Sequence, residues 1–89
     1  MKAIVTVVGK DTVGIIAGVC NALAEVNVNV LDISQTILQG YFTMIMVVDL
    51  SACDTPFEEL VTAMEKHGES RGLSIRVQRE DIFDAMHKI

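Results

Sequence analysis

The first third of the chain constrains the fold most strongly, because an apolar strand pattern runs through a glycine-containing loop directly into an apolar helix pattern. Lys2 to Val8 is dominated by β-branched residues and is largely apolar on both faces, as in a central strand. A loop from Gly9 to Gly14 follows, and a helix is predicted over about Thr12 to Val26, with Asp11 or Thr12 as its cap. This junction presents backbone N–H groups at a helix start, where small anions such as carboxylates bind.

The rest of the chain predicts three more strands and one more long helix. Strands are predicted over Val28 to Leu38 and Tyr41 to Leu50, joined by a Gln39-Gly40 hairpin turn. In the first of these, one face is expected to carry Asn29, Leu31, Ile33, Gln35 and Ile37. Thr55-Pro56-Phe57-Glu58 has the pattern of a capping box, so a helix should begin there and end near Gly68.

A last strand over Leu73 to Val77 is followed by an amphipathic pattern over about residues 80–89. The order β-α-β-β-α-β predicts an α+β, ferredoxin-like fold. In it, a four-stranded antiparallel sheet carries both helices on one face, because crossovers are right-handed. We expect one domain over residues 1–89, ending in a short C-terminal helix.

Composition and charge argue against several classes of function. The net charge is −5 and the seven Lys and Arg residues are scattered, so a nucleic-acid partner is not expected. Cys20 and Cys53 stand far apart without a C-x-x-C pair, so neither a zinc site nor a thioredoxin-type centre is expected, and a reducing compartment is favoured. No apolar run reaches membrane-spanning length and no signal-peptide pattern appears, so the sequence predicts a cytoplasmic protein without a membrane partner.

The predicted sheet indicates self-association. Two helices cover only one face of the sheet, yet the strand over Tyr41 to Leu50 is apolar on both faces. The strand over Val28 to Leu38 should lie at an edge and contains a single charge, Asp32. We expect a two-fold homodimer that pairs these edges, with a monomer whose tail covers its own sheet as the alternative.

The loop before the first helix is the candidate binding site. Gly9 and Gly14 permit close backbone approach, and the N–H groups of Gly14 and Ile15 should face outward. A free amino acid could place its carboxylate there and its ammonium near Asp11, Asn27 or Asn29. The same pattern is equally compatible with glycines that only turn the chain and an aspartate that only caps the helix.

The string Val8 to Val19, followed by Asn27-Val28-Asn29-Val30-Leu31-Asp32-Ile33-Ser34-Gln35, resembles the ACT domain. The likeness covers essentially the whole chain and is greatest to small stand-alone bacterial and archaeal ACT proteins. It implies a regulatory module that dimerises side by side and binds an amino acid at the interface. The ligand-binding positions it implies are Lys10, Asp11, Thr12, Val13, Gly14 and Ile15, with Asn29 on the partner strand and Asn27 at the preceding turn.

Three functions are therefore compared. The leading hypothesis is a non-catalytic, homodimeric amino-acid sensor that acts allosterically on a separate protein partner; the alternative is a ligand-free dimerisation module. An enzyme is not expected, because the first loop offers only Lys10 where ferredoxin-like acylphosphatases need an arginine. Catalytic residues, metal ligands and cofactors are not predicted.

Overall fold

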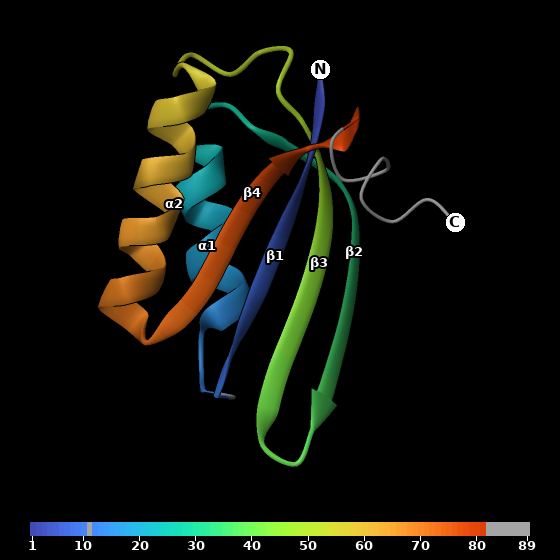
Figure 1. Cartoon of the computed structure of the whole chain (residues 1–89), viewed down its shortest axis with the longest axis vertical. Helices are drawn as coiled ribbons and strands as arrows, with labels where there is room; N and C mark the ends of the chain where they lie inside the picture. The colour runs from blue at the N-terminus through green and yellow to red at the C-terminus, as the bar shows by residue number, and fades with distance from the viewer. Residues whose placement is uncertain (11, 82–89) are drawn as a thin grey trace.

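A computed structural model describes residues 1–10 and 12–81 of the chain. The elements follow the order β1 (Lys2–Lys10), α1 (Ile15–Ala24), β2 (Asn29–Leu38), β3 (Tyr41–Asp49), α2 (Phe57–Arg71) and β4 (Leu73–Arg79). Neighbouring strands are antiparallel and lie in the order β2-β3-β1-β4. Figure 1 shows α1 and α2 side by side on the same face of this sheet. The ferredoxin-like prediction is confirmed, while the predicted C-terminal helix falls almost entirely on residues outside the described ranges.

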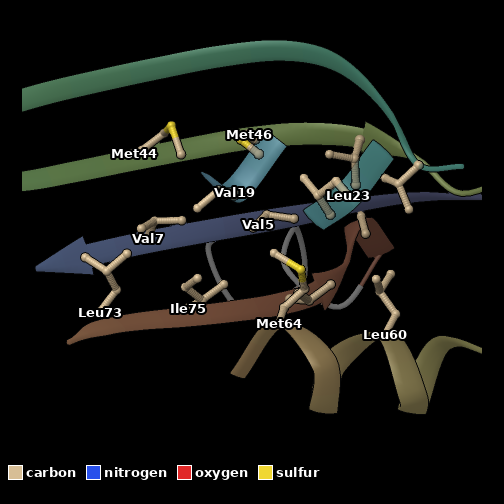
Figure 2. Packing of buried hydrophobic residues seen from close by; sticks show 14 of the residues in the cluster. Val5, Val7, Val19, Leu23, Met44, Met46, Leu60, Met64, Leu73 and Ile75 are labelled. Atoms are coloured by element: carbon tan, nitrogen blue, oxygen red, sulfur yellow. The ribbon is translucent and has the colours of Figure 1, made fainter. Parts of the chain in front are cut away.

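The core fills the space between the sheet and the two helices. Figure 2 shows Leu60 and Met64 of α2 pointing toward the strands, across from Val5 and Val7 of β1. Every second residue of the central strands faces this layer, so β1 contributes Ala3, Val5 and Val7, and β3 contributes Phe42, Met44, Met46 and Val48.

Two predicted turns are confirmed by their backbone angles. Gln39 (φ 52°) and Gly40 (φ 82°) are both left-handed, as a tight two-residue hairpin requires. Asn27 is also left-handed, with φ 60°, just beyond the end of α1.

The predicted start of the first helix was too early. α1 begins at Ile15, and its N-cap is Gly14 with φ 86°, so Thr12 is not the cap and Asp11 lies outside the described residues. Within α1, Ile15, Val19 and Leu23 are buried, whereas Ile16 is 36% exposed. Because α1 is apolar on adjacent sides, the spacing of its apolar residues does not by itself predict which side is buried.

The second helix begins within the predicted segment, at Phe57, but its predicted cap and its predicted end were wrong. The N-cap of α2 is Pro56 and makes no side-chain cap hydrogen bond, so the capping box does not form. The helix continues through Gly68 to Arg71, and Gly72 (φ 71°) ends it. Gly68 is buried, and a Cβ built there would lie 2.7 Å from the carbonyl oxygen of Leu73. The glycine therefore serves close packing against β4 rather than helix termination.

The predicted faces of the second strand hold over only part of its length. The pairing of β2 with β3 shifts between Val30 and Asp32, as in a β-bulge. Beyond the shift, Ile33, Gln35 and Ile37 share the helix-facing side, as expected. Before it, Val30 pairs with the buried Val48, which puts Asn29 on the opposite side.

Candidate functional site

The start of α1 has backbone donors that the helix itself does not use. Gly18 makes the first intrahelical bond, its N–H donating to the Gly14 carbonyl oxygen at 2.9 Å. The four preceding N–H groups, from Gly14 to Ala17, have no intrahelical acceptor because a helix leaves its first four donors unpaired. Gly14 has no side chain with which to cap them, unlike the Ser, Thr, Asp or Asn usual at this position.

A hollow of about 200 Å³ lies against this helix start. It is bounded by the first turn of α1 and the loop before it on one side, and by the end of β2 on the other. Its lining residues are Thr12, Gly14, Ile15, Ile16, Ala17, Gln35, Ile37 and Phe42. The four residues whose N–H groups lack an acceptor within the helix thus line the same small space, together with Gln35.

Within one chain, the structure brings only some of the predicted ligand residues to this hollow. Thr12, Gly14 and Ile15 line it. Lys10 is the exposed last residue of β1, opposite Tyr41. Val13 has a side chain that is 98% exposed, and its carbonyl oxygen accepts a hydrogen bond from Arg71 Nη2 at 3.3 Å.

Asn27 and Asn29 lie at the opposite end of α1. They line a separate hollow of about 330 Å³ with Ala24, Val28 and Ala52. The side-chain nitrogen of Asn27 already donates to Asp54 Oδ2 at 3.1 Å. A single chain therefore keeps these two asparagines apart from the loop before α1.

Electrostatics at that second end are set partly by Asp49, which pairs with Asn29 across β2 and β3. The hydroxyl of Ser51 lies 2.6 Å from Asp49 Oδ1 and its backbone N–H lies 3.0 Å away. Both hydrogen bonds stabilise the anion, the hydroxyl bond more, and hold the pKa of Asp49 below its ordinary value. A fixed negative charge therefore stands opposite Asn29 at neutral pH.

The sequence analysis missed the far wall of the hollow and the contact that holds its loop. Gln35, Ile37 and Phe42 reach the site from the β2–β3 hairpin. The sequence did contain a sign of this wall: the alternation predicted for the strand over Val28 to Leu38 puts the polar Gln35 on the same face as Ile37. Arg71 reaches the loop from the end of α2, and nothing in its local sequence marks it.

A larger hollow, of about 450 Å³, lies along α2 and is lined by Glu58, Glu59, Thr62, Ala63 and Lys66. All five residues are exposed and belong to one helix, so the hollow is a shallow surface groove without groups converging from different elements. The smaller hollow at the start of α1 is the better candidate site for this reason.

Metal and membrane sites were also sought among the described residues. Within residues 1–10 and 12–81, His, Cys, Asp and Glu do not gather in a group of three that could hold a metal ion. In the same part of the chain, none of the helices has the length and apolar character needed to cross a membrane.

The fold and the site together define a class of protein: a small ferredoxin-like domain with a hollow between the start of α1 and the edge strand β2. The chain belongs to the ACT domain family, whose profile matches residues 2–78. ACT domains are regulatory domains and often bind ligands.

Individual proteins are similar to this chain over most or all of its length. The chain is 53% identical to a UPF0237 protein of Listeria innocua over 100% of both chains. Its fold is similar to that of an ACT domain protein from Streptococcus pneumoniae, with a TM-score of 0.83, 47% identity and 98% of each chain covered. It is also similar to the ligand-free regulatory subunit of aspartate kinase from Thermus thermophilus, with a TM-score of 0.68 and 26% identity, covering 89% of this chain and 51% of that one.

Proposed function

We propose that this protein is a homodimeric sensor of a free amino acid and regulates a separate protein. The observation that carries the proposal is that Gly14 to Ala17, whose N–H groups have no acceptor within the helix, all line one small hollow. A carboxylate there would accept these bonds and gain about 0.3–1 kcal/mol from the helix dipole, or more when partly buried. The hollow is smaller than the roughly 300–1,000 Å³ of drug-sized pockets, which favours a small ligand.

Chain pairing is supported by the exposed edge of the sheet. β2 has a neighbour on one side only, and its apolar side chains stay open: Leu31 is 48%, Ile33 40%, Ile37 55% and Leu38 69% exposed. An exposed apolar edge of this length is a template for another strand. A second copy of β2 would pair with it around a two-fold axis and extend the sheet to eight strands.

This pairing also explains why the predicted ligand residues are separated within one chain. β2 starts at Asn29, far from the hollow, and ends at Leu38, beside it. An antiparallel pairing about the middle of β2 would place Asn29 of the second copy next to Leu38 of the first. The start of one β2 would then lie beside the hollow of the other chain, with the Asn29 side chain on the sheet face away from the helices.

Regulation would follow from linkage. A ligand bound between two chains stabilises the arrangement that binds it, and that arrangement presents one surface to a partner protein. The regulatory subunit of aspartate kinase, similar in fold, is consistent with this role. The proposal includes no chemical step, so the protein acts by binding and not as an enzyme.

Thermal unfolding in the presence of each standard amino acid tests the proposal. A ligand at about 100 times its Kd stabilises by about 2.7 kcal/mol. For a domain of this size, that corresponds to a Tm increase of about 11–22 °C. Absence of a shift with every amino acid at millimolar concentration would favour the ligand-free dimerisation module instead.

A further inference from the structure

The junction between α2 and β4 contacts the chain on both sides of the loop before α1. Figure 1 shows this junction and the start of α1 at the same end of the molecule. On the β1 side, Gly9 pairs with Leu73, and a Cβ built on Gly9 would lie 3.3 Å from the Gly72 carbonyl oxygen. On the α1 side, Arg71 Nη2 donates a hydrogen bond to the Val13 carbonyl oxygen at 3.3 Å. Three consecutive residues therefore hold both ends of the loop.

Two glycines of the other helix make room for the head of Arg71. Gly14 and Gly18 are four residues apart and so lie on the same side of α1. A Cβ built on Gly14 would lie 3.5 Å from Arg71 Nη2, and one built on Gly18 would lie 3.2 Å from Arg71 Nη1. Because neither position has a side chain, the guanidinium can approach the backbone of α1 and reach the Val13 carbonyl oxygen.

Arg71 places its positive charge between the ends of two helices. It is the basic residue in the last turn of α2, where a cation is favourable. The start of α1 is the positive end of the other helix dipole, and its first turn, Ile15 to Gly18, consists of uncharged residues. For α1 alone, a cation at this end is unfavourable. For an anion bound at the helix start, the dipole and the guanidinium are both attractive.

We propose that Arg71 is a positioning residue of the ligand site, a role that rests on the proposed function. Its hydrogen bond to Val13 fixes the backbone directly before Gly14, whose left-handed conformation (φ 86°) leads the chain into α1. Its charge adds to the attraction for a carboxylate at the first N–H groups of the helix. Arg71 is not among the described residues that line the hollow, so it acts through the loop and through its charge rather than by touching the ligand.

Substitutions at Arg71 can distinguish the polar head from the apolar stem. Arg71→Met keeps a long apolar side chain and removes the donor and the charge, whereas Arg71→Lys keeps a donor and the charge. Arg76→Met is the matched control. Arg76 is also exposed, but it lies on β4 paired with Thr6, on the sheet face away from the helices.

The ¹³C chemical shift of the Val13 carbonyl reports the hydrogen bond in the full chain without any ligand. We expect this signal to move upfield in Arg71→Met, because the carbonyl oxygen loses its donor. The movement should be smaller in Arg71→Lys and absent in Arg76→Met. A Val13 signal that stays in place in Arg71→Met would overturn the positioning role.

Titration with acetate tests the contribution of the charge, with the amide signals of Gly14 to Ala17 as the readout of binding. We expect Arg71→Met to weaken acetate binding about two- to fivefold, the effect of losing an exposed charge partner. Arg71→Lys and Arg76→Met should each change it by less than about twofold. Equal affinity of Arg71→Met and the wild type would overturn the contribution of the charge.

The two measurements separate a failure of this proposal from a failure of the proposed function. If acetate leaves the Gly14 to Ala17 signals of the wild type unchanged, the carboxylate site itself is contradicted, and the charge role of Arg71 with it. If acetate binds the wild type while the Val13 signal ignores Arg71→Met, the site stands and the positioning role of Arg71 is wrong.

Discussion

Gly14 meets two requirements of its position, a positive φ and the absence of a side chain, which the other standard residues do not meet together. Its φ of 86° is unfavourable for residues with a Cβ, and its lack of a side chain leaves the first N–H groups of α1 unobstructed. The sequence analysis included Gly14 among the candidate site residues, and the structure places it at the hollow, but Asp11 or Thr12 was expected to cap the helix. The difference matters functionally, because a side-chain cap would occupy donors that the proposed ligand needs.

Substitution of Gly14 can distinguish its contribution to the free energy of unfolding from its contribution to ligand binding. Gly14→Ala and Gly40→Ala place a Cβ at nearly the same angle, φ 86° and 82°, and neither meets an atom closer than 3.5 Å. Each should therefore lower the free energy of unfolding by a similar amount, about 1–2 kcal/mol.

Only Gly14→Ala should weaken binding of whichever amino acid raises the Tm, because Gly40 lies in the hairpin turn and does not line the hollow. Denaturant unfolding measures the stability, and titration calorimetry measures the affinity. If the two variants bind that amino acid equally well, the site is not at the start of α1.

At the scale of elements, the two helices differ in how closely their glycines approach the neighbouring structure. A Cβ at Gly68 of α2 would lie 2.7 Å from the backbone oxygen of Leu73 and 3.0 Å from Ile75 Cγ1. A Cβ at Gly18 of α1 would lie 3.2 Å from Arg71 Nη1, the end of a flexible side chain.

We therefore expect opposite responses to the same substitution. Gly68→Ala should destabilise the protein by about 1–3 kcal/mol, since α2 must move away from β4. Gly18→Ala should be close to neutral or stabilise by up to about 1 kcal/mol through helix propensity, because Arg71 can shift. Chemical denaturation of both variants provides the comparison; a destabilisation of Gly18→Ala as large as that of Gly68→Ala would contradict this account of the packing.

The edge strands offer a matched test of dimerisation. Ser34 on β2 and Ser74 on β4 are both exposed and both on the sheet face away from the helices. Ser34 lies near the middle of β2, so Ser34→Lys would bring two like charges close to the proposed two-fold axis.

Ser34→Lys should weaken the dimer by about 1 kcal/mol, roughly fivefold in its dissociation constant, and Ser74→Lys should not. The effect should shrink at high salt because the charges are exposed. Sedimentation equilibrium at two ionic strengths measures it. A dimer weakened equally by both substitutions would not be joined through β2.

For the molecule as a whole, the strand and helix order was predictable because it is encoded locally. The Gln39-Gly40 turn, the left-handed Asn27 and the apolar alternation of β3 each leave a signal within a few residues. The misassigned features depend on contacts between distant elements. Gly68 continues its helix because β4 packs on it, and the register shift near Leu31 follows from pairing with β3.

The candidate site divides in the same way. Thr12, Gly14 and Ile15 lie in one stretch of chain; the pattern of that stretch predicted Gly14 and Ile15, and the resemblance to the ACT domain added Thr12. Gln35, Ile37 and Arg71 come from other elements, so only the folded chain brings them to the loop. The predicted pairing of Asn29 with this site depends on a second copy and stays a proposal.

The most direct test of the sensing function is a two-dimensional ¹H–¹⁵N correlation spectrum of the protein titrated with each standard amino acid. The account predicts that at least one of them moves the amide signals of Gly14, Ile15, Ile16 and Ala17 downfield, as expected when a carboxylate accepts their hydrogen bonds. If these four signals stay in place while other residues respond, or if every amino acid leaves the spectrum unchanged, the helix start is not the binding site.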